Sequence, residues 1–171
     1  GSGMGRAACM ALAAEGARVV LGNRNREQGE AVDAAIVAAG GQAVFQPTDV
    51  SKPSDCADLV QRAIAAFGRL DGAFNNAGLQ REFCDIHETP DADISDVIDI
   101  NLKGMLYMMK YEAAAMLASG GGSIVNNSSI FGLKAMPRLA YYVAAKHGII
   151  GATRAARSEE HTSELQSRWI I

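Results

Sequence analysis

Short apolar runs alternate with longer amphipathic segments from the start of the chain to about residue 156. The short runs are rich in β-branched and other apolar residues, and they predict strands at 17–21, 43–46, 72–75 and 123–127. The longer segments keep apolar residues at helical spacing, and they predict helices at 4–15, 26–39, 53–67, 94–119 (broken near Ile100) and 141–156. This alternation is typical of an α/β domain.

The order of these elements predicts how they are connected. Strands that alternate with helices at this spacing are expected to be parallel, joined by right-handed crossovers with helices on both faces. The strands are nearly all apolar rather than alternating, as a sheet covered on both faces requires. We therefore expect one α/β domain with a doubly wound parallel sheet, in which ligands bind at the carboxyl ends of the strands.

Composition and charge exclude several classes of protein. The chain has 171 residues, of which 49% are hydrophobic and 20% charged, as expected for one folded domain rather than a disordered chain. A formal net charge of −3 provides no basic face for a nucleic acid. The uncharged run 113–133 could span a bilayer, but it contains three consecutive glycines and the polar run 126–129, so we expect no membrane segment.

The three cysteines lie far apart in the sequence, without a C-x-x-C pair. They predict neither a disulfide framework nor a zinc site, so we expect no metal ligands. This cysteine usage favours a reducing compartment, the cytoplasm.

Unusual residues occur in three segments at or near the predicted strand ends. The glycine-rich segment 1–5 leads into a helix, whose free N–H groups could bind a pyrophosphate, although a cloning remnant would look the same. The segments 75–78 (N-N-A-G) and 127–129 (N-S-S) would each indicate only a turn or a helix cap if taken alone.

A fourth segment, 142–146, pairs a tyrosine with a lysine. Tyr142 and Lys146 stand at i and i+4 and therefore share one face of the last predicted helix. A phenol beside an ammonium ionises more readily than a free phenol, which suits a general acid/base for an alcohol–ketone pair. On an exposed helix the same pair would simply face the solvent and have no catalytic role. The i+4 partner of Tyr141 is Ala145, so we assign Tyr141 to packing.

Taken together and in this order, the segments resemble the short-chain dehydrogenase/reductase family. The matching pieces are G-S-G-M-G at 1–5, Asp49-Val50 after a strand, N-N-A-G at 75–78, Asn101 in I-N-L-K-G, G-S-I-V-N-N-S-S ending at Ser129, and Y-V-A-A-K at 142–146. The resemblance implies a Rossmann-type doubly wound parallel sheet. It also implies an NAD(P)-dependent oxidoreductase that interconverts an alcohol and a ketone or aldehyde by hydride transfer, with a small-molecule substrate and a homodimeric or homotetrameric assembly.

The resemblance assigns roles residue by residue. In the catalytic set, Tyr142 is the general acid/base and Lys146 promotes its ionisation and holds the nicotinamide ribose. Ser129 steadies the substrate oxygen, and Asn101 holds a water in the proton relay. The cofactor-binding set comprises Gly3, Met4, Gly5, Asn23, Arg24, Asp49, Val50, Asn75, Ala77, Gly78, Tyr142 and Lys146.

The choice of cofactor depends on the residues after the strand at 17–21. A carboxylate there would bond the ribose 2′-hydroxyl and repel a 2′-phosphate. Here Asn23 stands in the place of the acid and Arg24 follows it, and a guanidinium suits a phosphate. We therefore expect NADP(H) to be preferred, with NAD(H) as the alternative. Arg24 and Arg26 could also be no more than solvated loop charges.

The sequence says little about the substrate. A moderately apolar wall is predicted from Ile130, Phe131, Leu133 and Met136. An epimerase or dehydratase relative is disfavoured, because those larger relatives usually lack N-N-A-G.

The sequence departs from the family pattern at both ends. The family's first strand, which lies between the strands at 17–21 and 72–75, has no counterpart, and neither do the strands and substrate lid after residue 156. Residues 157–167 (R-S-E-E-H-T-S-E-L-Q-S) resemble a translated DNA-sequencing adapter. We therefore expect residues 1–156 to be a partial domain truncated at both ends, and 157–171 to be a non-native tail. The alternative function is a catalytically incompetent fragment, at most a damaged nucleotide-binding module.

Overall fold

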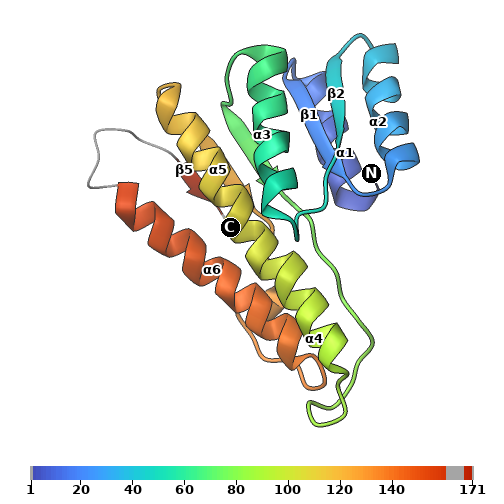
Figure 1. Ribbon diagram of the computed structural model, residues 1–171, viewed down its shortest axis with the longest axis vertical. Coiled ribbons are helices and arrows are strands. Elements are labelled where there is room, and N and C mark those ends of the chain that lie inside the picture. Colours follow the sequence, from blue (N-terminus) through green and yellow to red (C-terminus); the bar gives the residue numbers. More distant parts are fainter. Residues whose placement is uncertain (1, 161–167, 171) are drawn as a thin grey trace.

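The computed structural model describes residues 2–160 and 168–170 (Figure 1). Its helices are α1 (Gly3–Ala14), α2 (Arg26–Ala38), α3 (Pro53–Phe67), α4 (Asp91–Val97), α5 (Gly104–Ala118) and α6 (Ala140–Glu160), with a π-helical segment (Ile98–Lys103) and a short 3-10 helix (Ile130–Gly132). Its strands are β1 (Arg18–Asn23), β2 (Gln42–Pro47), β3 (Gly72–Asn75), β4 (Ser123–Asn126) and β5 (Arg168–Ile170).

Each predicted strand and helix has a counterpart within a few residues. The break expected near Ile100 is the π-helical segment that joins α4 to α5. Two features differ from the prediction: α6 continues past residue 156 to Glu160, and β5 follows where no strand was expected. An open strand edge offers unpaired backbone groups to any extended segment, and β5 pairs with such an edge of β4. Residues 161–167 of the adapter-like segment lie outside the described residues.

The strands are all parallel, but they form two sheets rather than one. β1 pairs with β2 from Arg18↔Gln42 to Asn23↔Pro47. In the second sheet β4 lies between β3 and β5. No pairing joins β1 to β3 in the part of the chain that the structure describes, so the inner edges of these two strands remain apart. The α/β class with parallel strands is confirmed, and the division lies between β1 and β3, where the sequence has no counterpart of the family's first strand.

Helices cover both faces of the first sheet. α1 and α2 pack on one face, around Val19 and Leu21 of β1 and Val32 and Ile36 of α2. Gly22 alternates to the opposite face from Leu21, and there it meets Leu59 of α3. The expected doubly wound arrangement is therefore present around β1 and β2.

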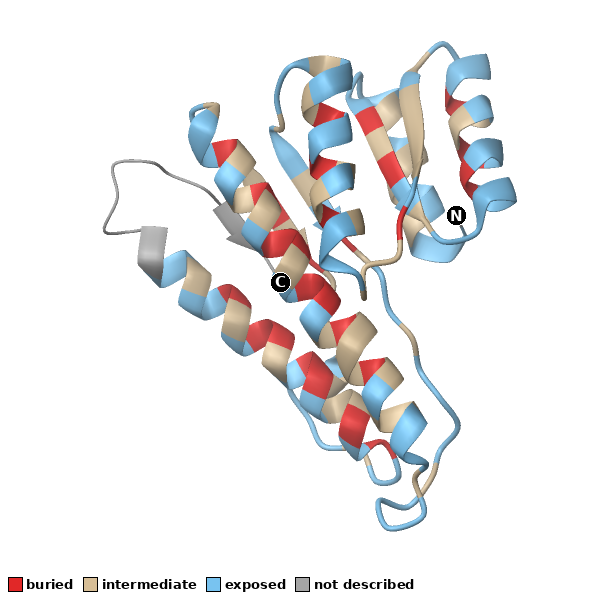
Figure 2. Cartoon of the chain, viewed as in Figure 1, coloured by how far each residue is buried: buried red, intermediate tan, exposed pale blue. Residues whose placement is uncertain are grey.

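The second sheet packs against α5 and α6. The shared core consists of Met105, Met109 and Met116 of α5, Ile124 of β4 and Ile149 of α6. Figure 2 shows buried segments in red along both helices. Phe74 of β3 alternates to the other face and is 37% exposed. The expectation that every strand is covered on both faces is therefore wrong for β3, whose main contacts are with β4 and α5.

Local signals fix the helix ends near the strand termini. The Asn25 side chain caps α2 by accepting a hydrogen bond from the Gln28 N–H at 3.0 Å. Pro53 begins α3, where its fixed backbone angle suits the first turn. Gly68 ends the same helix with φ at +83°, in the left-handed region that glycine enters without strain.

Candidate functional site

The site is built where β3 and β4 end side by side. Asn75 and Asn126 are register partners at the carboxyl ends of these parallel strands. The Asn127 N–H donates to the Asn75 carbonyl at 2.9 Å, and the Asn127 side chain donates to Asn76 Oδ1 at 2.8 Å. The N-N-A-G and N-S-S segments are therefore joined directly, although Asn76 and Asn127 are 51 positions apart in the sequence.

Tyr142 and Lys146 of α6 reach the same point. Lys146 Nζ donates to the Asn127 carbonyl at 3.0 Å and lies 5.7 Å from the centre of the Tyr142 ring. Lys146 is only 4% exposed, and burial lowers the pKa of its ammonium. A Cβ placed on Gly78 would lie 3.7 Å from Lys146 Nζ, so the N-N-A-G segment also borders the ammonium.

Ser129 and its neighbour have different tasks. Ser129 Oγ accepts a hydrogen bond from the Phe131 N–H at 3.2 Å and so caps the short 3-10 helix. As the acceptor in this bond, the Ser129 hydroxyl still has its proton to donate. Ser128 Oγ donates to the Lys146 carbonyl at 2.9 Å, which ties the strand end to α6.

Asn101 fastens the loop that follows Gly78. It lies fully buried in the π-helical segment. Its Oδ1 accepts from the Leu79 N–H and its Nδ2 donates to the Leu79 carbonyl, both at 2.7 Å. The side chain therefore satisfies both backbone groups of Leu79 at once. The sequence did not indicate this clamp, because nothing in the pattern relates residue 101 to residue 79.

Tyr141 points elsewhere than Tyr142. Its hydroxyl donates to the Glu82 carbonyl at 2.8 Å, and the residue is 4% exposed. Burial, and then the nearby Asp93 carboxylate, raise the pKa of this phenol. The structure thus places Tyr141 against the loop after β3, whereas Tyr142 is half-buried beside Lys146.

The start of α1 lies beside the end of β3. The N–H groups of Gly3, Met4 and Gly5 precede the first helical hydrogen bond, from the Arg6 N–H to the Ser2 carbonyl at 3.3 Å. A Cβ on Gly5 would approach Asn76 Nδ2 to 3.1 Å, so only glycine fits there without displacement. This brings three free N–H groups, which favour an anion, next to the N-N-A-G segment.

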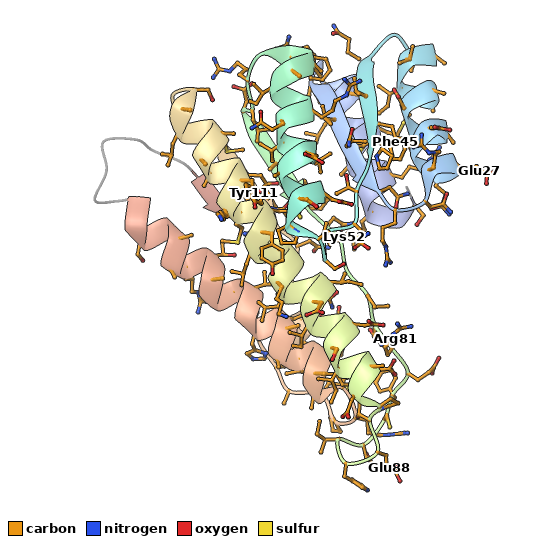
Figure 3. The ribbon with its side chains drawn as sticks, in the orientation of Figure 1. Glu27, Phe45, Lys52, Arg81, Glu88 and Tyr111 are labelled. Atoms are coloured by element: carbon orange, nitrogen blue, oxygen red, sulfur yellow. The ribbon has the colours of Figure 1, made fainter. Side chains whose placement is uncertain are left out.

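A pocket of about 280 Å³ opens beside these segments. Its lining consists of Arg24, Asp49, Ser51, Leu79, Arg81, Asp96, Asp99 and Ile100. Arg81 comes from the long loop after β3 (Figure 3). It forms ion pairs with Asp93 and Asp96 of α4. Asp99 pairs with Lys103 at 2.8 Å. Arg24 and Asp49 are the two predicted cofactor residues that the structure brings together here.

The Asp49 carboxyl is held in its ionised form. Burial opposes ionisation, but Asp49 Oδ1 accepts hydrogen bonds from Ser51 N–H at 3.1 Å and Ser51 Oγ at 2.8 Å. With Arg24 and Lys52 also nearby, the pKa of this carboxyl lies below its usual range. Asn23 does not line the pocket, and its amide donates instead to the Asn25 carbonyl at 3.1 Å. Val50 also lies outside the lining; its carbonyl accepts from the Cys56 thiol at 3.4 Å.

A buried polar chain underlies the joined strand ends, and the sequence analysis missed it. Asn75 Nδ2 donates both to Glu112 Oε2 of α5 at 2.7 Å and to Asn126 Oδ1 at 3.0 Å. Asn126 Nδ2 donates to Thr153 Oγ1 at 3.0 Å, and Thr153 donates to the Ile149 carbonyl at 2.7 Å. Burial raises the pKa of Glu112 to about 7, against the opposing effect of the Asn75 bond. The sequence signal that could have indicated this chain is Glu112, an acidic residue at a core position of the otherwise apolar helix α5.

Neither a membrane segment nor a metal centre is found in the described part of the chain. None of the helices there combines the length and apolarity needed to cross a bilayer. Residues 2–160 and 168–170 also contain no cluster of three His, Cys, Asp or Glu side chains placed to hold a metal ion.

Parallel strands whose ends meet a glycine-rich helix start are typical of α/β proteins that bind nucleotides. The family model described as "short chain dehydrogenase" matches residues 1–168, so the chain belongs to the short-chain dehydrogenase/reductase family. Cyclohexanol dehydrogenase of Acinetobacter sp. (strain SE19) is 42% identical over 159 residues, which are 93% of this chain and 63% of that protein.

Solved structures agree with this family assignment. A metagenomic short-chain oxidoreductase in complex with NADP superposes with a TM-score of 0.90 at 34% identity, covering 97% of this chain and 75% of that one. NAD⁺-bound xylitol dehydrogenase gives a TM-score of 0.90 at 30% identity, covering 96% of this chain and 62% of that one. The chain thus spans about three fifths of the length of the curated cyclohexanol dehydrogenase.

Proposed function

We propose that the protein containing this chain is an NAD(P)-dependent oxidoreductase that interconverts a secondary alcohol and a ketone. The observation that carries the proposal is the position of Lys146 Nζ, 5.7 Å from the Tyr142 ring centre and bonded to the Asn127 carbonyl. An ammonium, a phenol and the Ser129 segment thus meet at the joined strand ends, where this fold class binds its ligands.

The residues present fit a dinucleotide. The free N–H groups of Gly3–Gly5 suit its pyrophosphate, and the pocket that contains Arg24 and Asp49 suits the adenosine end. Asn75, Ala77 and Gly78 would flank the adenosine ribose, and Lys146 would hold the nicotinamide ribose. When bound, the nicotinamide donates or accepts the hydride.

The protein's own groups handle the proton. Tyr142 takes the proton of the alcohol during oxidation and returns it to the carbonyl oxygen during reduction, a role worth roughly 10² to 10⁴ in rate. The buried Lys146 ammonium places its positive charge 5.7 Å from the centre of the Tyr142 ring. The Ser129 hydroxyl proton is directed to the substrate oxygen. Asn101 contributes by fixing Leu79 and thereby the N-N-A-G loop, in addition to the proton-relay role expected for it.

For the cofactor we propose a preference for NADP(H). Arg24 is exposed and lines the pocket next to Asp49, so its guanidinium is available to a 2′-phosphate. Asn23 presents no carboxylate that would repel this phosphate.

For the substrate we propose an apolar secondary alcohol such as a cyclic one. Ile130 follows Ser129 directly and Leu133 lies three residues further on, and they are 57% and 64% exposed. Apolar side chains left open beside the proposed reacting groups suit an apolar ring, and a relative that is 42% identical is named cyclohexanol dehydrogenase.

The second proposal is that the chain binds the nucleotide but does not catalyse the reaction. The observation in its favour is the separation of β1 from β3, because these strands carry the two halves of the proposed cofactor site.

One experiment separates the two functions. The 171-residue chain is titrated with NADPH, followed by fluorescence, and then assayed for NADP⁺-dependent oxidation of cyclohexanol. Saturable binding with turnover supports the oxidoreductase, and binding without turnover supports the second proposal. If NADPH does not bind, both proposed functions are contradicted for this chain.

A further inference from the structure

Glu112 is a buried acid for which the proposed reaction provides no task. It lies in the middle of α5 and is 3% exposed. Within the described residues no Lys, Arg or His forms an ion pair with it, and its partner is the Asn75 amide at 2.7 Å. A carboxyl group without a cation is costly to bury, and the hydrogen bond from Asn75 offsets part of this cost.

The hydrogen bond of Glu112 leads by two further steps to Lys146. The Asn75 amide is held by Glu112, while the Asn75 carbonyl accepts from the Asn127 N–H at 2.9 Å. The Asn127 carbonyl in turn accepts from Lys146 Nζ at 3.0 Å. The carboxyl of α5 is therefore connected to the ammonium of α6 through the ends of β3 and β4.

The Asn75 amide also joins α5 to the end of β4. Its nitrogen has two protons, one directed to Glu112 and the other to Asn126. A change in how strongly Glu112 accepts therefore changes how Asn75 sits against Asn126, its register partner.

We propose that Glu112 is a positioning residue: by holding the Asn75 amide it sets the alignment of the β3 and β4 ends, and thereby the position of the Asn127 carbonyl that anchors Lys146. The proposal rests on the role given to Lys146 under the proposed function. Glu112 itself contacts neither substrate nor cofactor.

A positioning carboxyl makes this alignment depend on pH. A carboxylate accepts a stronger, charge-assisted hydrogen bond than a carboxylic acid does, so ionised Glu112 holds the Asn75 amide more tightly. Burial places the pKa of Glu112 at about 7, so the change falls near neutral pH. As the pH rises through this value, the Asn75 amide is drawn toward α5.

The groups that surround Glu112 do not titrate in the same range. On the α3 side its titratable neighbour is Cys56, whose thiol pKa is raised to about 11 by burial and then by the charges of Asp55, Glu112 and Asp49. β3, β4 and α6 present the neutral side chains of Asn75, Asn126 and Thr153.

The test is an NMR titration of the full chain between about pH 5 and pH 9, a window centred on the ionisation of Glu112. The signals are the Glu112 carboxyl carbon, the Asn75 side-chain amide, the Asn127 N–H and the Lys146 ammonium. We expect all four to share one midpoint in the wild type and in the packing control Met116→Leu. In Glu112→Gln the Asn127 and Lys146 transitions should be lost. In Cys56→Ala they should remain.

Two results would overturn the proposal: Asn127 and Lys146 signals that stay flat while Glu112 titrates, or transitions that persist in Glu112→Gln. NADPH affinity gives an independent reading. Glu112→Leu should weaken it roughly tenfold, and Glu112→Gln, which keeps an acceptor, should stay within about threefold of wild type. If Glu112→Leu does not fold, the Glu112→Gln comparison decides. If the wild type binds no NADPH, the proposed function fails while the titration still decides the role of Glu112.

Discussion

At the scale of single residues, the two positions after β1 determine the expected cofactor preference. Arg24→Ala combined with Asn23→Asp removes the proposed phosphate partner and adds a repelling carboxylate. We expect the ratio of kcat/KM for NADP⁺ to that for NAD⁺ to fall by at least about tenfold, the equivalent of one lost charged contact. Arg26→Ala, which removes a helix-surface charge paired with Glu30, serves as the control. A wild type that already prefers NAD⁺ would contradict this account.

Glu112 should make the stability of the fold depend on pH. Its pKa rises from 4.5 to about 7 on folding, so between these values the unfolded chain releases the proton while the folded chain retains it. The free energy of unfolding therefore falls as the pH rises through this window, by roughly 3 kcal/mol. Glu112→Gln does not ionise, so its stability relative to wild type should grow by that amount from about pH 4 to about pH 8. Urea denaturation at the two pH values measures this, and a constant difference would exclude Glu112 as the cause.

At the scale of elements, the π-helical segment is joined to the loop after β3 by one side chain. Asn101→Ala leaves the Leu79 N–H and carbonyl without their partner, at a cost of about 1–3 kcal/mol in unfolding free energy. Asn101→Asp keeps the acceptor for the N–H but cannot donate to the carbonyl, so it should fall between the two. Thermal or urea unfolding of the three proteins checks this order. An Asn101→Ala variant as stable as wild type would show that the clamp contributes little.

The elements themselves were largely predictable, because each depends on local pattern. Pro53 at the start of α3 and Gly68 after its end bracket an apolar stripe that only a helix can bury. β5 could not be predicted, since R-W-I pairs with β4 only because an open strand edge lies beside it.

The site was predictable only in part. Tyr142 and Lys146 share a helical face and could be paired from spacing alone, and the joined 75–78 and 127–129 segments follow from parallel strand ends. The Asn101–Leu79 clamp and the Glu112–Asn75 bond join residues that are 22 and 37 positions apart, on elements whose packing no local pattern specifies. Ser51 was missed because its hydrogen bonds to Asp49 arise from the turn geometry after β2.

At the scale of the whole molecule, the division of the sheet is the dominant feature. β4 is flanked by β3 and β5, whereas β1 and β3 each have one neighbour among the described strands. In a parallel sheet the N–H groups of alternate residues point to the same side, so an open edge leaves alternate amides unprotected. We expect hydrogen exchange to be fast at alternate amides of β1 and β3 and slow along β4. Uniform protection across β1 and β3 would mean that their inner edges are paired in solution.

The central claim is that Tyr142, beside Lys146, carries the proton of an alcohol–ketone reaction. The most direct measurement compares NADP⁺-dependent alcohol oxidation by the wild type, Tyr142→Phe and Tyr141→Phe, with NADPH affinity measured for each. Tyr142→Phe should lower kcat by roughly 10² to 10⁴ while NADPH affinity stays nearly unchanged, because only the proton-transfer group is lost. Tyr141→Phe should be mild, since its hydroxyl bonds the Glu82 carbonyl. A Tyr142→Phe enzyme that retains its activity, or a Tyr141→Phe change that is the more damaging of the two, would contradict the account.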